Sequence, residues 1–322
     1  MYNKDIKIFD CTIRDGGLIN KWQFSPEMVR TVFNALHLAG VDYMEIGYRA
    51  SEKLFTPGEY GPWRFCKDSV IREIMGNTVT DMKMGVMVDI DRVDPDDIAP
   101  RSESPLSFIR VATYLKDVDK AISLANEIHE KGYESFINIM AISTVNNFDL
   151  EEGLRQIENE THVTAVSVVD SNGGLYPETT DHLVRFFNTT LKSRKVGFHG
   201  HNNLQLGFAN TIQAVHSGVN FCDATIYGIG RGAGNCPLEL LIPWLKNPKY
   251  KLEPLLQVIE DVFLDLGKKI EWGYILPYMI TGMLNEHPRA AISLRNSDKK
   301  DCYAEFFRTL TTPECLNDSN ND

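Results

Sequence analysis

The alternation of short apolar runs with helical patterns is the feature that most limits how this chain can fold. Eight runs have the length and composition of buried strands: 6–11, 43–47, 83–89, 107–112, 135–142, 165–170, 195–201 and 222–228. Most are continuously apolar, as are strands covered on both faces of a parallel sheet. Eight strand–helix units within about 245 residues predict a TIM barrel, whereas a doubly wound sheet usually has about five or six strands.

The segments between these runs carry helix signals. Ser25 and Pro26 open a pattern over 26–39 in the way that a capping hydroxyl and a first-turn proline open a helix, and Gly40 closes it. A loop at 228–234, GIGRGAG, superficially resembles a dinucleotide-binding turn. It follows the last predicted strand instead of the first, so we expect a small-molecule loop at the barrel mouth.

The pattern changes near residue 247, after which it is helical only. Helices are predicted at 253–271, 276–285 and 298–310. A length of 322 residues would also suit two domains, but the pattern favours a barrel over 1–247 with a helical extension over 248–322. The final residues, NDSNND, are polar enough to predict disorder.

Composition excludes several classes of partner. The chain has 33 Lys and Arg against 44 Asp and Glu, a net charge of −11 that disfavours nucleic acid. No secretory signal is visible, and no apolar run approaches the roughly 20 residues that span a bilayer. Six cysteines without a CxxC pair predict reduced thiols and argue against a zinc knuckle. We expect a cytoplasmic protein that binds neither nucleic acid nor membrane.

Polar residues cluster where the predicted strands end. In a TIM barrel these ends form the mouth that carries the active site. The polar segments are Asp10 to Gly17, Glu45 to Arg49, Asp170 to Gly174, His199 to Asn203, and the loop that holds Arg231 and Asn235. We therefore expect the chemistry to lie at this mouth.

The sharpest local signal is the H-x-H pair His199 and His201. Residues two apart on a strand point to the same side, so the imidazoles lie about 7 Å apart on one face, which suits two ligands of one metal. Asp15 is a candidate third ligand and Asn235 a fourth. Nitrogen and oxygen ligands with open positions suit Mn²⁺ or Mg²⁺, with Co²⁺, Zn²⁺ or Fe²⁺ as alternatives. The alternative is that both histidines only form hydrogen bonds in the mouth.

Three arginines and a glutamate have two interpretations each. Arg14 beside a metal would stabilise an enolate oxygen, with Glu45 orienting it. The alternative is that Arg14 and Asp15 form an exposed salt-bridging pair in a turn and that Glu45 is a rim carboxylate. Arg49 and Arg231 would hold an anionic substrate, or they are solvated charges of the rim. The six other histidines are predicted to be structural or surface residues: His37, His129, His162, His182, His216 and His287.

Three motifs together resemble the DRE-TIM metallolyase superfamily: FDCTIRDGG at 9–17, GFHGHNN at 197–203 and GIGRGAGNCPLE at 228–239. Its members include 4-hydroxy-2-oxovalerate aldolase, 3-hydroxy-3-methylglutaryl-CoA lyase and the homocitrate and isopropylmalate synthases. The GAGN-x-PLE form and VVDSNGG at 168–174 resemble the aldolase branch most. The resemblance covers the predicted barrel and implies the TIM fold.

The resemblance also implies a site. Asp15, His199 and His201 would bind a divalent metal, with Asn235 as a further or outer ligand. Arg14 would stabilise the enolate of a 2-oxo acid such as pyruvate. The remaining correspondences place Ser171 near the substrate carboxylate and match Glu45 to the glutamate of the second strand. The implied reaction is reversible carbon–carbon cleavage that releases an aldehyde.

The chain departs from the aldolase branch at one position that matters. Those aldolases carry a histidine base shortly after R-D-G, where this chain has Leu18, which cannot transfer a proton. Lys21, Tyr274, Tyr278 or metal-bound water are the alternatives. Aldolases of this branch bring a tyrosine from the C-terminal part to the site, although both tyrosines also suit the core of an apolar helix. In the loop with Arg231, the lyase branch instead has a catalytic cysteine.

Three functions therefore stay open. A metal-dependent aldolase or lyase acting through a 2-oxo acid enolate is the leading hypothesis. An acyl-CoA-dependent condensing synthase is disfavoured because the chain lacks the long C-terminal regulatory domain of many synthases, and a metal-binding scaffold without a base is the non-catalytic alternative. An amidohydrolase would place H-x-H on the first strand. We expect the helical extension to pair with another copy or with a dehydrogenase.

Overall fold

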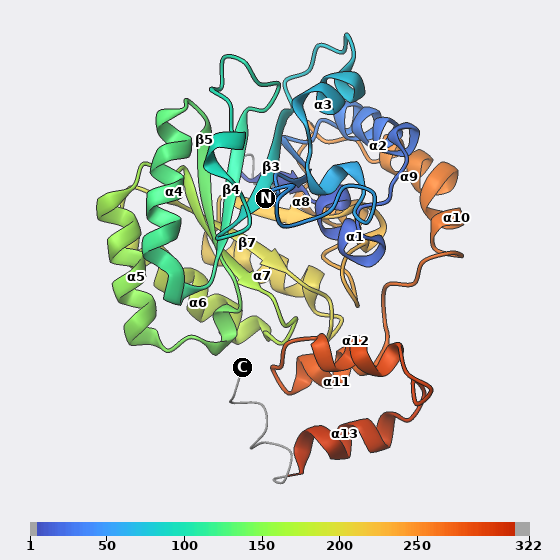
Figure 1. The fold of residues 1–322 in the computed structure, drawn as a ribbon. Coiled ribbons are helices and arrows are strands. Elements are labelled where there is room, and N and C mark those ends of the chain that lie inside the picture. The colour runs from blue at the N-terminus through green and yellow to red at the C-terminus, as the bar shows by residue number, and fades with distance from the viewer. Residues whose placement is uncertain (1–4, 313–322) are drawn as a thin grey trace.

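Eight parallel strands form a closed barrel in the order of the sequence, which confirms the predicted TIM fold. The computed structural model describes residues 5–312, and helices surround the strands (Figure 1). The predicted disorder at the C-terminus lies outside these residues. The strands are Lys7–Asp10 (β1), Tyr43–Tyr48 (β2), Lys83–Asp89 (β3), Phe108–Thr113 (β4), Glu134–Ile139 (β5), Ala165–Asp170 (β6), Lys195–Gly200 (β7) and Phe221–Ala224 (β8).

The barrel helices follow the expected punctuation. The helix predicted over 26–39 is confirmed: the Ser25 hydroxyl accepts a hydrogen bond from the Met28 backbone N–H at 3.2 Å, and Gly40 ends the helix at φ +76°. The helices are Thr12–Asn20 (α1), Pro26–Ala39 (α2), Asp68–Met75 (α3), Val118–Glu130 (α4), Asn147–Glu160 (α5), Pro177–Thr190 (α6), Gly207–Ser217 (α7) and Leu238–Leu245 (α8).

The last strand is shorter than predicted. β8 ends at Ala224 instead of continuing to residue 228, because Ile226–Gly228 forms a 3-10 turn in which Tyr227 has φ +54°. The backbone N–H of Asn235 then donates to the Gly228 carbonyl at 3.0 Å. The turn brings the glycine-rich loop back over the mouth of the barrel.

The inside of the barrel is layered. Five aromatic rings with neighbouring centroids 4.3–6.0 Å apart form an apolar floor: Phe9, Tyr43, Phe108, Phe136 and Phe221. Because inward-facing residues alternate along a strand, the residues two positions further on form the next layer. They are Cys11, Glu45, Arg110, Asn138 and Asp223, all buried. This polar layer separates the floor from the mouth.

The C-terminal region divides into two parts. Glu253–Val258 (α9), a π-helical turn over Ile259–Phe263 and Leu264–Leu266 (α10) form one segment, and α9 packs against α2 of the barrel. This segment ends before residue 271, where the sequence predicted its end. The boundary at residue 247 stays a prediction.

Three further helices lie to one side of the barrel (Figure 1). They are Leu276–Met283 (α11), Arg289–Arg295 (α12) and Tyr303–Thr311 (α13), around an apolar cluster that also includes Ala233 of the glycine-rich loop. The sequence predicted one helix over 298–310 and missed α12. Residues 298–302 instead form a turn in which the Cys302 backbone N–H donates to the Lys299 carbonyl.

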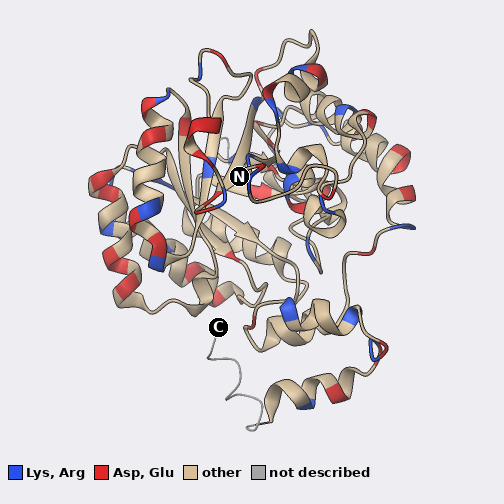
Figure 2. Ribbon diagram, in the orientation of Figure 1, with Lys and Arg blue, Asp and Glu red and all other residues tan. Residues whose placement is uncertain are grey.

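Residues of both charges are spread over the ribbon, with many acidic residues on α4 and α5 (Figure 2). The five cysteines of the described chain, Cys11, Cys66, Cys222, Cys236 and Cys302, are free thiols. Across residues 5–312, no helix is both long enough and apolar enough to span a bilayer.

Candidate active site

Three of the predicted metal ligands meet at the mouth. Asp15 comes from α1, while His199 and His201 come from the end of β7, and all three are buried. One ligand atom of each lies within 4.8 Å of the other two. The sequence correctly predicts which residues come together here.

Hydrogen bonds fix the direction in which both imidazoles offer a lone pair. His201 Nδ1 lies 2.9 Å from the Asp170 carbonyl oxygen, and His199 Nδ1 lies 2.9 Å from Asp223 Oδ2. Since both partners accept, each Nδ1 carries a proton, and Nε2 is the nitrogen of each ring that can face a metal. Burial lowers the pKa of His201 to about 3, so this ring is neutral at physiological pH.

The residues fit a divalent cation. His199 Nε2 is buried and has no hydrogen-bond partner in the described chain, and the same holds for Asn235 Oδ1. Burial opposes the charge of Asp15, but Arg14 beside it holds the pKa of this carboxyl well below its usual range. A carboxylate, two imidazoles and an amide are ligands for a small divalent ion, and a cation would satisfy the orphaned buried atoms.

A close approach of the glycine-rich loop completes this corner. Asn235 Nδ2 donates to Asp15 Oδ2 at 2.6 Å. A Cβ atom at Gly230 would lie 2.0 Å from Asn235 Nδ2 and 2.5 Å from Asp15 Oδ2, which no side chain permits. Gly230 therefore lets the loop reach the metal ligands.

Arg14 is held on two sides. Its Nε donates to Glu45 Oε2 at 2.6 Å and its Nη1 to Asp15 Oδ1 at 2.5 Å. Arg14 and Glu45 are buried, so they are neither an exposed pair nor a rim carboxylate. Nη2 donates to none of the described residues, and Arg14 lines a cavity at the mouth.

Two further charged residues support the site, and the sequence analysis missed both. Arg110 Nη2 donates to Asp223 Oδ2 at 2.7 Å, and Asp223 in turn holds His199. Although burial favours the neutral acid, Arg110 and His199 lower the pKa of Asp223 to about 2. With Arg14, Asp15 and Glu45, this buried network has one more carboxylate than guanidinium, which a bound cation would offset.

The cavity has a volume of about 80 Å³, which is room for several waters or a small organic acid. Predicted site residues supply one wall: Arg14, Asp15, Ser171, His199, His201 and Arg231. Leu18 and His287 also line it. His287 is exposed, as the prediction of a structural or surface residue allows, and the link between α11 and α12 also brings it to the edge of the cavity.

Besides Glu45 and Asn235, which contact the site from below and from the loop, four predicted residues lie outside the cavity lining. Arg49 forms an ion pair with Asp68, and Lys21 pairs with a glutamate on the surface. Tyr274 is 62% exposed, and the Tyr278 ring packs on Gly232 in the apolar cluster of the extension. None of the three side chains suggested as a base, Lys21, Tyr274 and Tyr278, borders the cavity.

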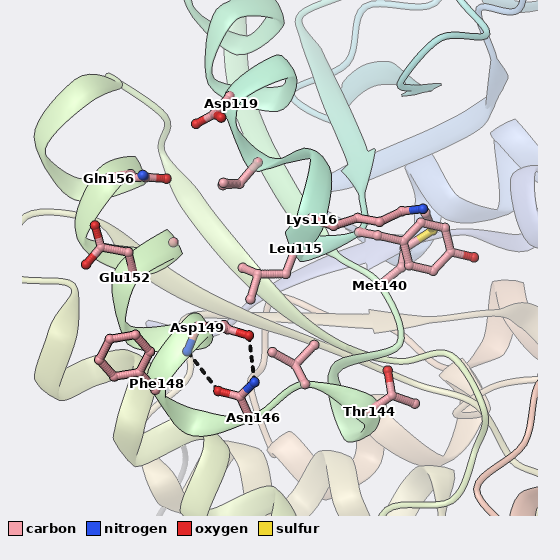
Figure 3. Close-up of a pocket in the computed structure, with 14 residues that line it drawn as sticks. Leu115, Lys116, Asp119, Met140, Thr144, Asn146, Phe148, Asp149, Glu152 and Gln156 are labelled. Carbon is pink, nitrogen blue, oxygen red and sulfur yellow. Dashed lines mark hydrogen bonds between the residues drawn. The ribbon is translucent and has the colours of Figure 1, made fainter. Parts of the chain in front are cut away.

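A larger open groove of about 500 Å³ adjoins the cavity (Figure 3). It lies between the starts of α4 and α5, and Tyr114 and Met140 line both spaces. Lys116 extends toward Met140 and makes no ion pair with described residues (Figure 3). The mouth therefore offers a small inner cavity and a wider outer groove.

Comparison with known proteins places this arrangement in a family. The HMGL-like family model matches residues 106–262. The 4-hydroxy-2-oxovalerate aldolase of Thermus thermophilus is 30% identical over 260 residues, which cover 79% of this chain and 74% of the relative. The oxaloacetate decarboxylase of Mycobacterium tuberculosis is 29% identical over 242 residues, covering 74% and 70%.

Solved structures agree. The N-terminal domain of a predicted aldolase from Bacteroides vulgatus matches with a TM-score of 0.77 and 30% identity, covering 93% of this chain and 100% of that one. The HMG-CoA lyase of Bacillus subtilis matches with a TM-score of 0.69 over 83% of this chain and 95% of that one. At 16% identity, the second match supports the fold alone.

Barrel, ligands and motif order define a member of the DRE-TIM metallolyase superfamily, as the three sequence motifs predicted. Within it, the chain belongs to the family of the 4-hydroxy-2-oxovalerate aldolases, whose members cleave carbon–carbon bonds.

Proposed function

We propose that the protein is a divalent-metal-dependent aldolase that makes or breaks a carbon–carbon bond through the enolate of a 2-oxo acid such as pyruvate. The observation that carries the proposal is the convergence of Asp15, His199 and His201 beside Arg14 in one cavity. An aldehyde is the second substrate, in keeping with the names of the relatives.

The charged and polar side chains at the cavity have distinct roles in the proposed reaction. A bound divalent ion, with Mn²⁺ or Mg²⁺ favoured over Co²⁺, Zn²⁺ or Fe²⁺, would act as a Lewis acid on the keto oxygen. Arg14 Nη2 donates to the enolate oxygen while Glu45 and Asp15 fix the guanidinium. The Ser171 oxygen accepts the Ala141 N–H at 2.8 Å, which leaves its own proton for the substrate carboxylate.

The groove supports an aldehyde that extends beyond its carbonyl group. Leu115 and Phe148 offer apolar surface there, and Lys116 offers an ammonium that makes no ion pair within residues 5–312. Arg231 lines the cavity, and Arg49 is engaged by Asp68. An anionic group on the aldehyde would therefore meet Lys116 or Arg231 instead of Arg49.

Exchange of the pyruvate methyl protons in D₂O tests the proposal without knowledge of the aldehyde. With Mg²⁺ present, we expect the wild type to exchange these protons, as followed by NMR, and Arg14→Met to reduce the rate at least about 100-fold. Exchange with acetyl-CoA but not with pyruvate would favour the condensing synthase. No exchange with either would favour the scaffold.

A second candidate is decarboxylation of oxaloacetate. Leu18 lines the cavity where the aldolases of this branch have their base, and loss of CO₂ needs no removal of a hydroxyl proton. The carbon–carbon bond to the carboxylate breaks, its electron pair forms the pyruvate enolate, and the enolate takes a proton from water. Pyruvate formation above the rate with metal alone, lost in Arg14→Met, would support this activity.

We also propose a cellular location and a type of partner. The free thiols Cys11, Cys66, Cys222, Cys236 and Cys302 support a cytoplasmic protein.

Met283 and Phe307 are exposed apolar residues on α11 and α13, which supports a homo-oligomer or a dehydrogenase partner at the extension. Size-exclusion chromatography with light scattering, alone and with a co-purified dehydrogenase, tests this surface.

A further inference from the structure

His287 occupies a place that neither the sequence motifs nor the family explains. It lies on the link between α11 and α12 and borders the cavity together with Leu18 and Arg231. Among the lining residues it is the one imidazole besides the two metal ligands. A polar ring therefore faces the same space as the leucine that replaces the usual base.

The hydrogen bonding of His287 fixes where its proton lies. Nδ1 accepts the backbone N–H of Arg289 at 3.2 Å. Since an N–H group can only donate, Nδ1 holds a lone pair, and a neutral ring carries its proton on Nε2. Nε2 has no hydrogen-bond partner between residues 5 and 312, so this N–H is available to a substrate.

The surroundings keep the ring neutral. His287 is exposed on one side, and its partial burial on the other lowers the pKa of His287 to about 4; the positive charges of Arg231 and Arg289 act in the same direction. A base needs a lone pair on the nitrogen that faces the substrate, whereas a neutral ring with its proton on Nε2 is a hydrogen-bond donor. Enzymes use such neutral imidazoles to polarise carbonyl groups.

We propose that His287 donates its Nε2–H to the aldehyde oxygen of the second substrate, and this inference rests on the proposed aldolase function. In the addition, the enolate carbon forms the new carbon–carbon bond, and the π electron pair of the aldehyde moves to its oxygen. His287 stabilises the developing charge and keeps its own proton. The oxygen then takes a proton from water, and cleavage follows the same steps in reverse.

The donor role separates two reactions of one enzyme. Enolisation of pyruvate involves no aldehyde, so it does not use His287, whereas addition to an aldehyde does. We expect His287→Leu to lower kcat/KM for aldol addition about 100-fold while pyruvate methyl exchange stays within about twofold of wild type. The probes are acetaldehyde, glycolaldehyde and glyceraldehyde 3-phosphate, each with pyruvate and Mg²⁺.

Two matched variants accompany this measurement. His287→Gln keeps an amide donor and should recover part of the lost rate. His182→Leu removes an exposed histidine of α6 that does not line the cavity, and it should behave as wild type. Equal aldol rates in His287→Leu and wild type would overturn the proposal, as would an equal loss of methyl exchange.

Nitrogen NMR of the histidine side chains adds a readout that does not depend on turnover. We expect His287, assigned by its absence in His287→Leu, to show the neutral form protonated on Nε2 between pH 5.5 and 8. A cationic His287 at pH 6, or an acid limb of the aldol rate near pH 6.5 that vanishes in His287→Leu, would overturn the donor role. A wild type without methyl exchange would instead refute the proposed function, and the spectrum would still decide the state of His287.

Discussion

His199 and His201 are held by partners of different kinds, a carboxylate and a backbone carbonyl. Only one of these two hydrogen-bond partners can be changed by substituting a side chain. The Asp170 carbonyl belongs to the strand and is fixed by the fold, whereas Asp223 can be replaced. Metal affinity should therefore depend on Asp223, a side chain of the polar layer that lies below the mouth of the barrel.

Loss of a ligand should abolish binding of the metal. We expect wild type to bind one divalent ion per chain. We expect His199→Ala to bind none, because only two of the three converging ligands would remain, which is too few to hold the ion. Isothermal titration with Mn²⁺ measures this, with His182→Ala as the control. Unchanged stoichiometry in His199→Ala would show that the metal lies elsewhere.

Asp223→Asn should weaken both the metal site and the fold. The neutral amide oxygen of Asn would accept a weaker hydrogen bond from His199 than the carboxylate does, so Mn²⁺ affinity should fall about 10- to 100-fold. Arg110 would lose its closest carboxylate inside the barrel, which should lower the free energy of unfolding by about 3 kcal/mol. Urea unfolding and metal titration measure the two effects, and full stability would contradict the buried pair.

Asp10 gives a pH dependence whose sign is fixed. Burial raises the pKa of Asp10 to about 7, although the Thr12 hydroxyl and N–H donate to its carboxyl. Between about pH 4 and 7 the folded state binds a proton that the unfolded state has lost, so this group's contribution to stability falls as pH rises. Relative to Asp10→Asn, wild type should lose up to about 1.4 kcal/mol per pH unit in this range and level off above it. Urea unfolding from pH 4 to 8 measures the difference, and a constant gap would contradict the raised pKa.

At the scale of elements, α1 shows what sequence patterns cannot reveal. A turn was one of the two interpretations of Arg14 and Asp15, and no helix was predicted there; Gly16 and Gly17 each disfavour a helix by about 1 kcal/mol. The helix forms because the Trp22 ring packs where Gly17 has no side chain, and Trp22 Nε1 donates to the Arg14 carbonyl at 2.9 Å. This contact depends on a tertiary fold that local propensity does not encode.

Most strands, in contrast, could be predicted well from the sequence. Their apolar runs are long and bounded by polar residues, and β6 begins and ends as expected. The inward charges were missed because Arg110 and Asp223 sit singly within apolar runs. A signal exists: an aromatic residue two positions before a charge recurs in β2, β4 and β8, at Tyr43, Phe108 and Phe221.

The glycine-rich loop offers a test at this scale. Gly230→Ala would place a methyl group against Asn235 and Asp15, so the loop would have to withdraw from the ligands. We expect lost Mn²⁺ affinity with little change in the melting temperature, because the strands and the aromatic floor are untouched. Gly58→Ala, at a glycine whose Cβ would meet open space, is a control for metal affinity. Normal affinity in Gly230→Ala would contradict the close approach.

For the whole molecule, the extension is attached to the barrel by a few polar contacts. The Ser143 hydroxyl donates to Asn285 Oδ1 at 2.6 Å, and Asn172 Nδ2 donates to the Asn285 carbonyl at 3.0 Å. Asn203 Nδ2 donates to the Tyr278 carbonyl at 3.2 Å. His287 follows two residues after Asn285, so the same attachment places it at the cavity. No sequence pattern announced this, since the contacts join segments more than 70 residues apart.

Loosening that attachment should separate catalysis from metal binding. We expect Asn285→Ala to lower the aldol rate about 10-fold and to speed proteolysis between α10 and α11, with Mn²⁺ affinity unchanged. Limited trypsin digestion and metal titration measure these effects. Intact activity and proteolytic resistance would show that the apolar cluster alone holds the extension.

The aromatic floor of the barrel determines from which side substrates reach the site. Phe9, Tyr43, Phe108, Phe136 and Phe221 seal the end of the barrel opposite the mouth. Whatever enters beside Arg14 therefore comes from the side of the mouth, where Tyr114 and Met140 border both the cavity and the outer groove. In a cavity that is closed at one end, the substrate that binds deepest has to bind first, and the product formed from it has to leave last.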